Sequence, residues 1–364
     1  MLLMYLLGLV VLVNCIYYIL FSTFSFQKVQ KKFESPQFPV SILICAKNEA
    51  ENLNRHIPLW LDQEYPDFEL ILINDASSDN TLEVINQFAN TDPRIKVVNV
   101  ENNEAFWGSK KYALTLGIKK ASNKRLLFTD ADCRPASSSW ISLMASDFSE
   151  KKQIVLGYGA YEKEPGLLNA LIRYETLVTA LQYYSYAKNG LPYMGVGRNL
   201  AYTSNLFYDN KGFTSHMKVQ SGDDDLFVNK AATSTNTALQ YDPESFTYSI
   251  PKKTWSGWFK QKRRHSSTAK YYKPKHKLYL GAYFIFNLLF WVFAILAPIF
   301  SNWKITLLII LFRFSIQCIV QARAAMKFRE IGLIIFMPLL ELFLVCVQLS
   351  IFISSRTSKP SPWK

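Results

Sequence analysis

Long uncharged hydrophobic segments at both ends constrain this chain of 364 residues most strongly. Residues 1–26 carry no charged side chain, and residues 278–300 form a run of 23 uncharged residues. About 20 apolar residues are enough to cross a bilayer as a helix, so each segment is predicted to span a membrane. Residues 305–320 and 331–353 are predicted to form two further spans. The first segment lacks the basic start and the cleavage site of a signal peptide, so we interpret it as a retained anchor.

The positive charge of the chain is concentrated next to these hydrophobic segments. The formal net charge is +13, and residues 251–277 contain ten Lys or Arg but no Asp or Glu. Trp255 and Trp258 lie in the same stretch, a composition typical of a segment at a membrane surface. Membrane lipids are therefore the expected partner, and nucleic acid is not. Because Lys28, Lys31 and Lys32 follow the first segment, the positive-inside rule places residues 27–277 in the cytoplasm.

Short apolar runs alternate with helical patterns between the hydrophobic ends. This alternation predicts βαβ units and an α/β fold with a mostly parallel sheet. We expect four parts: a membrane helix at 1–26, an α/β domain at 38–250, the interfacial segment at 251–277, and about three membrane helices at 278–353. The predicted strands are 40–45, 68–73, 95–100, 125–129 and 154–160, and the predicted helices include 51–63, one from about residue 80, and 109–121.

Polar and acidic residues follow these strands, at the edge where such sheets bind ligands. Ser78 and Asp79 fit helix caps as well as a ligand site. Asp130 and Asp132 are different, because two carboxylates this close repel each other unless a cation or a proton lies between them. Oxygen ligands of this type suit Mg²⁺ or Mn²⁺ together with phosphate oxygens. Cys133, beside this pair, is interpreted as a packing residue, and the five cysteines fit no disulfide framework or zinc set.

Six motifs in a fixed order resemble the family 2 glycosyltransferases. They are ILICAKNEAENL (42–53), NDASSDNT (74–81), GSKKYAL (108–114), TDADCRP (129–135), SGDDDL (221–226) and QKRRH (261–265). The resemblance covers roughly residues 38–270, and the flanking membrane helices also match membrane-anchored bacterial members. It implies a GT-A catalytic domain at 38–250, a nucleotide-diphosphate sugar as donor with UDP favoured over GDP, a divalent metal, and inversion at the anomeric centre.

The resemblance also implies roles for individual residues. Asp130 and Asp132 match the metal-binding D-x-D motif. Asp223 matches the catalytic base, and Asp224 is the reserve candidate. The nucleotide-binding residues implied are Ala46, Asn48, Glu49, Asp75, Lys110 and Asp130, and those implied for the acceptor and the diphosphate are Gln261, Arg264 and His265. Two positions depart from the family pattern: Asn74 replaces an acid before Asp75, and His265 replaces the tryptophan of the Q-x-x-R-W motif.

The chemistry requires the same residue types. A sugar hydroxyl is a poor nucleophile and needs a carboxylate to accept its proton, while the leaving diphosphate needs a metal ion and basic side chains. We therefore expect a membrane-anchored glycosyltransferase that acts on a lipid-linked or glycan acceptor in cell-envelope synthesis, at the bacterial inner membrane. The alternatives are a processive polysaccharide synthase and a non-catalytic nucleotide-binding subunit of a membrane assembly. Four spans are too few for a self-contained transporter.

Overall fold

The computed structural model describes residues 1–28, 36, 38–101, 109–219 and 221–357. Lys31, Lys32 and Gly108, which belong to the charge and motif patterns above, lie outside the described residues. The described chain divides into two compact units. The α/β unit contains the described residues up to Glu162 that follow Lys28, together with Gly190–Pro251. The helical unit contains Met1–Lys28, Lys163–Asn189 and the described residues from Lys252 onward.

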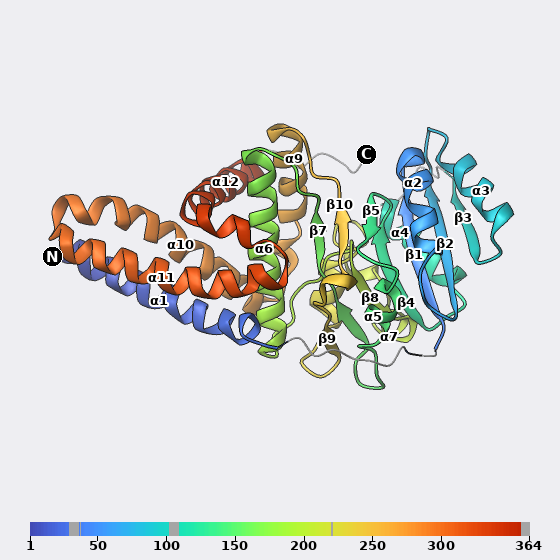
Figure 1. Ribbon diagram of the computed structural model, residues 1–364, viewed down its shortest axis with the longest axis horizontal. Helices are drawn as coiled ribbons and strands as arrows, with labels where there is room; N and C mark the ends of the chain where they lie inside the picture. Colours follow the sequence, from blue (N-terminus) through green and yellow to red (C-terminus); the bar gives the residue numbers. More distant parts are fainter. Residues whose placement is uncertain (29–35, 37, 102–108, 220, 358–364) are drawn as a thin grey trace. The chain divides into compact units, whose positions relative to one another are not determined.

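The α/β unit is built on a seven-stranded sheet in the order β3-β2-β1-β4-β8-β6-β9 (Figure 1). The first four strands are parallel, β8 runs antiparallel to both of its neighbours, and β9 is parallel to β6. The mostly parallel sheet expected from the sequence is confirmed. The strands are β1 (Val40–Ala46), β2 (Phe68–Asp75), β3 (Ile95–Val100), β4 (Arg125–Asp130), β6 (Ile154–Leu156), β8 (Leu200–Thr203) and β9 (Thr237–Leu239).

The core of this unit follows from the apolar runs of the sequence. Every residue of β1 and β2 is buried, as expected for strands that are covered on both faces. Leu53, Ile57 and Trp60 recur at helical spacing on α2 and pack into the same core. The helices of the unit are α2 (Ala50–Leu61), α3 (Thr81–Thr91), α4 (Ser109–Lys120), α5 (Trp140–Ala145), α7 (Ser204–Asp209) and α8 (Asp225–Ala231), with short 3₁₀ turns at Thr214–His216 and Pro243–Ser245.

A second, three-stranded sheet lies in the same unit, in the order β5-β10-β7. Its strands are β5 (Cys133–Pro135), β10 (Thr247–Ser249) and β7 (Gly159–Tyr161). The strand predicted at 154–160 is therefore wrong as a single element, because its two halves belong to different sheets. The chain turns at Gly157, whose amide donates to the Asn199 carbonyl at 3.0 Å. A Cβ atom at Gly157 would lie 2.5 Å from Cγ of the Asn199 side chain, so the turn requires glycine.

The helical unit contains four helices that are long and apolar enough to cross a membrane, among the described residues. They comprise α1 (Leu2–Ser25), α10 (Pro274–Phe300), α11 (Trp303–Lys327) and the segment Ile331–Ser355, in which the 3₁₀ turn Ile331–Phe336 leads into α12 (Met337–Thr357). The unit also contains α6 (Leu167–Lys188), α9 (Trp255–Ser266) and the 3₁₀ turn Ala269–Tyr271. The sequence did not predict that α6 groups with the hydrophobic helices, where Tyr184 stacks on Phe24 of α1 at 4.8 Å.

One arginine connects the four hydrophobic helices through a buried network. Each of the five N–H groups of the Arg313 guanidinium donates to a side-chain oxygen. Nε donates to Asn14 at 3.1 Å, and Nη2 donates to Asn287 at 3.0 Å. Nη1 and Nη2 donate to the two Glu341 oxygens at 2.7 and 2.8 Å, and Nη1 also donates to Gln317. The residues come from α1, α10, α11 and α12, so a single charged group contacts every predicted span.

Candidate active site

The candidate site lies at the carboxyl ends of the central parallel strands. β1 pairs with β2 on one side and with β4 on the other, so the order in which strands are added to the sheet reverses between β1 and β4. Open α/β sheets bind ligands at such a switch point. Ala46 ends β1 and Asp130 ends β4, and Asp75 ends β2, where it is buried. Three of the predicted site residues are thus brought to one edge of the sheet.

The loops after β1 and β2 are joined by polar contacts. Asn48 has a positive φ of 56°, and its Oδ1 accepts from the Ser78 amide at 2.8 Å. Its own amide donates to Ser77 Oγ at 3.0 Å. The Glu49 amide donates to Thr81 Oγ1 at 2.9 Å, at the start of α3. Asn48 and Glu49 therefore hold a defined loop against the loop that follows β2.

Two of the polar side chains after β2 have local structural roles. Asp79 Oδ1 accepts from the Thr81 amide at 3.0 Å and Asp79 Oδ2 accepts from the Ala50 amide, so Asp79 satisfies the first amides of α3 and α2. It is not the N-cap residue of either helix. Asn74 donates to Asn99 at 2.7 Å and accepts from the Ser77 amide, which stabilises the turn. The amide side chain that replaces a family carboxylate therefore has a local structural role, and Asp75 is the remaining acid at this strand end.

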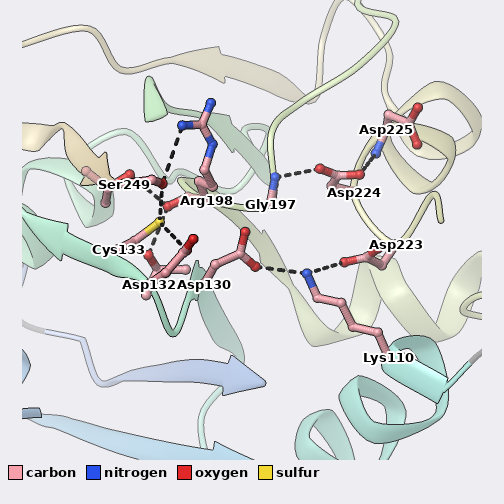
Figure 2. Close-up of polar contacts among 12 residues, drawn as sticks. Lys110, Asp130, Asp132, Cys133, Gly197, Arg198, Asp223, Asp224, Asp225 and Ser249 are labelled. Atoms are coloured by element: carbon pink, nitrogen blue, oxygen red, sulfur yellow. Dashed lines mark hydrogen bonds and ion pairs between the residues drawn. The ribbon is translucent and has the colours of Figure 1, made fainter. Parts of the chain in front are cut away.

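Lys110 connects the two acidic segments of the site. It lies in the first turn of α4, and its Nζ lies 2.8 Å from Asp130 Oδ1 and 3.1 Å from Asp223 Oδ2 (Figure 2). Burial opposes the charge of this lysine, but Asp130 and Asp223 outweigh that effect and raise the pKa of Lys110 well above its ordinary value. Lys110 is thus a fixed positive charge between the D-x-D aspartate and the candidate base.

Asp223 and Asp224 are adjacent in sequence but differ in their surroundings. Burial alone would raise the pKa of Asp223, but the charges of Lys110 and Lys111 dominate and lower it. Burial, together with the charges of Asp223 and Asp225, raises the pKa of Asp224 to about 7. Both Asp224 oxygens accept backbone hydrogen bonds, from Gly197 N and Asp225 N, each at 2.7 Å. Asp224 therefore joins two backbone segments, while Asp223 faces the lysine.

The D-x-D segment offers a donor set that fits a hard divalent cation. Ligand atoms of Asp130, Asp132 and Cys133 lie within 4.8 Å of one another, and both carboxylates are partly exposed. Burial, with the charges of Asp132 and Asp130, raises the pKa of the Cys133 thiol well above its ordinary value. A neutral thiol is a poor metal ligand, and Cys133 Sγ lies 3.0 Å from Ser249 Oγ. The two carboxylates remain as the donors, and oxygen donors suit Mg²⁺ or Mn²⁺.

Comparison with known proteins identifies this domain. Residues 41–211 match the family model described as Glycosyl transferase family 2. Residues 41–211 therefore form a family 2 glycosyltransferase domain. An uncharacterized glycosyltransferase of Haemophilus influenzae is 32% identical over 136 residues, which are 36% of this chain and 40% of that protein. The poly-beta-1,6-N-acetyl-D-glucosamine synthase of Staphylococcus epidermidis is 40% identical over 93 residues, 26% of this chain and 21% of the synthase. The matched stretches thus span less than half of either relative.

A solved structure supports the GT-A fold of the glycosyltransferase domain. A mannosyltransferase of Pyrobaculum calidifontis, in complex with GDP-Man and Mn²⁺, superposes with a TM-score of 0.56 at 16% identity. The superposition covers 92% of this chain and 99% of the mannosyltransferase. At this identity the likeness establishes the fold. The fold class expected from the motifs is therefore confirmed.

Within the glycosyltransferase domain, Lys111 is a site-supporting residue that the sequence analysis missed. It is 2% exposed, and its Nζ donates to the Ser221 carbonyl at 2.7 Å and to the Val219 carbonyl. These carbonyls belong to the segment just before Asp223. Lys111 therefore attaches α4 to the loop that carries the candidate base. The only signal in the sequence was the pair of lysines in GSKKYAL. Lys110 contacts two carboxylates, whereas Lys111 contacts backbone carbonyls.

Gln261, Arg264 and His265 lie on α9, which belongs to the helical unit. Thr254 caps this helix by accepting from the Gly257 amide at 3.1 Å, and Arg263, Arg264 and His265 occupy its last turn. Basic side chains at this end of a helix interact favourably with its dipole. The role of Gln261, Arg264 and His265 toward the acceptor and the diphosphate stays a prediction.

Proposed function

We propose that the protein is a membrane-anchored inverting glycosyltransferase. It takes a sugar from a nucleotide-diphosphate donor, with UDP favoured, and transfers it to a lipid-linked or glycan acceptor in cell-envelope synthesis. The observation that carries the proposal is the position of Lys110 between Asp130 and Asp223, at the switch point of a family 2 domain. In the proposal Asp130 binds the metal and Asp223 is the base, and the Lys110 ammonium lies between these two carboxylates.

The proposed reaction is a single displacement. The acceptor hydroxyl oxygen forms a bond to the anomeric carbon as the bond from that carbon to the diphosphate oxygen breaks. The hydroxyl proton passes to the Asp223 carboxylate, and the electron pair of the broken bond stays on the diphosphate. Lys110 is proposed to offset part of the negative charge that develops on the leaving diphosphate. Asp224 is the second candidate for the base, since a pKa of about 7 suits proton transfer at neutral pH.

Asp130 and Asp132 are the residues that would hold Mg²⁺ or Mn²⁺, and the solved mannosyltransferase complex with Mn²⁺ supports this assignment. A divalent cation bound there would neutralise charge on the donor diphosphate. Ala46, Asn48, Glu49 and Asp75 are proposed to contact the nucleotide from the loops after β1 and β2. Gln261, Arg264 and His265 are proposed to contact the acceptor end and the diphosphate.

The membrane setting is part of the proposal. Four apolar helices support insertion in a membrane, and the basic charge of residues 251–277 supports a cytoplasmic catalytic domain at a bacterial inner membrane. A processive synthase is the second candidate, because the poly-N-acetylglucosamine synthase is 40% identical over its matched stretch. His265 in place of tryptophan offers a smaller stacking face and favours transfer of one or a few sugars.

The test is donor turnover by the purified full-length protein in detergent. UDP-glucose, UDP-N-acetylglucosamine, UDP-galactose and GDP-mannose are supplied one at a time with a bacterial membrane lipid extract, and release of the nucleoside diphosphate is measured with Mn²⁺, Mg²⁺ or EDTA. We expect metal-dependent release from at least one donor. We expect the release to be lost in Asp132→Ala and kept in the exposed control Asp62→Asn. If a donor binds tightly but no donor releases its nucleoside diphosphate, the protein is a nucleotide-binding subunit instead.

A further inference from the structure

Arg198 lies between the metal-binding segment and the segment of the candidate base, and no role has yet been assigned to it. Its carbonyl oxygen accepts from the hydroxyls of Thr129 and Thr247, each at 2.9 Å. Thr129 directly precedes Asp130, and the neighbouring Gly197 amide donates to Asp224. Figure 2 shows Arg198 between Cys133 and Ser249 on one side and Gly197 on the other. The backbone at this arginine is thus fixed to both halves of the site.

The guanidinium of Arg198 is held along one edge only. Its Cζ lies 4.2 Å from the centre of the Tyr161 ring, and Nη1 donates to the Ala160 carbonyl at 3.0 Å and to Ser249 Oγ at 3.4 Å. A Cβ atom at Gly159 would lie 2.9 Å from Cβ and 3.2 Å from Nε of Arg198, so the glycine makes room for this arrangement. Nε and Nη2 have no hydrogen-bond partner among the described residues. Two N–H-bearing nitrogens therefore remain to receive a ligand.

Arg134, an arginine of the small sheet, provides an internal comparison. Arg134 of β5 lies over Tyr248, with Cζ 4.8 Å from the ring centre, and its Nε lies 2.6 Å from Glu162 Oε1. Arg198 lies over Tyr161 in a similar way, but no carboxylate of the described chain lies within the 4.0 Å of an ion pair. Asp132 and Asp130 act on the charge of this guanidinium at longer range, but neither carboxylate forms an ion pair with it. Its fork of N–H groups matches a carboxylate or a phosphate.

We propose that Nε and Nη2 of Arg198 bind an anionic oxygen group of the acceptor, a phosphate or a carboxylate. This inference rests on the proposed function and specifies the acceptor as an anionic one. The acceptor is favoured over the donor because Arg198 adjoins Gly197, which holds Asp224 beside the candidate base. The donor diphosphate already has charge partners in Lys110 and in a cation at Asp130 and Asp132. Arg198 would therefore be a specificity-determining residue for the acceptor.

The test measures binding of three small probes to the full-length protein in the presence of UDP and Mn²⁺, by calorimetry. Methyl β-D-glucoside is the neutral probe, methyl β-D-glucuronide carries a carboxylate, and methyl β-D-glucoside 6-phosphate carries a phosphate. We expect the wild type to bind one anionic probe more tightly than the neutral one. The anionic probe that binds more tightly identifies the acceptor group as a phosphate or a carboxylate. Arg198→Gln should weaken that binding about 10- to 100-fold and leave UDP binding unchanged.

Two further variants keep the test decisive. Arg134→Gln is the matched control, because it removes a stacked arginine that already has a carboxylate partner, and it should leave probe binding unchanged. Arg198→Lys keeps the charge without the planar fork and should give intermediate binding even if Arg198→Gln folds poorly. Equal binding of all three probes to the wild type would overturn the proposal, as would loss of UDP binding in a folded Arg198→Gln. If Arg198 binds the anionic probe but the protein turns over no donor, the proposed transfer reaction is contradicted and the anion site is not.

Discussion

Two charge clusters in this protein differ in how far their side chains are buried. In the helical unit the side chains of Arg313 and Glu341 are 0% and 5% exposed, and every N–H group of the guanidinium has a partner. In the α/β unit Lys110, Asp130 and Asp223 are 19%, 33% and 12% exposed. We call the first the closed cluster, because every N–H group of its guanidinium has a partner, and the second the open cluster. The second keeps carboxylate oxygens within reach of solvent, where ligands can reach them.

The difference predicts how each cluster should respond to substitution. A buried ion pair with all its hydrogen bonds made orients the helices that carry it, since any other packing would leave a charge unpaired. An ion pair at the open edge of a parallel sheet can exchange partners when a phosphate and a cation arrive. We therefore expect changes in the first cluster to alter folding, and changes in the second to alter ligand binding and chemistry.

The largest expected effect is beside the open cluster, at Asp132, whose ligand oxygen lies within 4.8 Å of that of Asp130. Asp132→Ala should abolish transfer and sharply weaken binding of UDP in the presence of Mn²⁺, because the cation joins the carboxylates to the diphosphate. Calorimetry with UDP, with and without Mn²⁺, measures the loss. The thermal stability without ligand should stay close to that of the wild type. Metal-dependent activity in Asp132→Ala would show that the D-x-D assignment is wrong.

The closed cluster should respond with stability instead. Arg313→Leu leaves the Glu341 carboxylate buried without its partner and should lower the free energy of unfolding by about 3–5 kcal/mol. Thermal unfolding in detergent measures this effect, with Leu308→Ala on the exposed side of α11 as the control. The double variant Arg313→Leu, Glu341→Leu should be more stable than the single variant. A double variant less stable than the single one would contradict the closed-network account.

Asp224 provides a smaller effect that depends on pH. Its pKa is about 7 in the folded protein and about 4 in an unfolded chain, so folding favours the protonated form. The stabilisation is fully present below about pH 4 and is lost as the pH rises through 7. Relative to the wild type, Asp224→Asn should therefore gain a few degrees in melting temperature between pH 4 and pH 8. If the melting temperatures of the two proteins differ by the same amount at every pH in this range, the raised pKa of Asp224 is contradicted.

The smallest expected effect concerns the length of the product. His265→Trp should retain an acceptor sugar ring better, because indole offers a larger stacking face than imidazole. Product sizing by mass spectrometry should show one or a few sugars for the wild type and longer products for the variant. Products of unchanged length would indicate that the small number of membrane spans, and not residue 265, limits product length. Long polymer made by the wild type alone would contradict the prediction of few transfers.

The strands and the acidic residues could be predicted because their signals are local. Continuous apolar runs predicted β1 and β2, and the residues that follow them were found at one sheet edge. The ion pair of Lys110 with Asp223 could not be predicted, since it joins positions 113 residues apart through the tertiary fold. The same holds for Arg198, because its contacts come from β7 and β10. α6 carries no strong amphipathic pattern, and its placement with the hydrophobic helices depends on contacts distant in sequence.

The central claim is that Asp223 removes the acceptor proton at the open cluster. The most direct test compares Asp223→Asn and Asp224→Asn for UDP binding and for turnover of the donor that the wild type uses. Asp223→Asn should bind UDP with near wild-type affinity and lower turnover by roughly 10²–10⁴-fold, the contribution of general base catalysis. Asp224→Asn should keep most of the turnover. Wild-type turnover by Asp223→Asn, or the loss appearing only in Asp224→Asn, would contradict the assignment of Asp223 as the base.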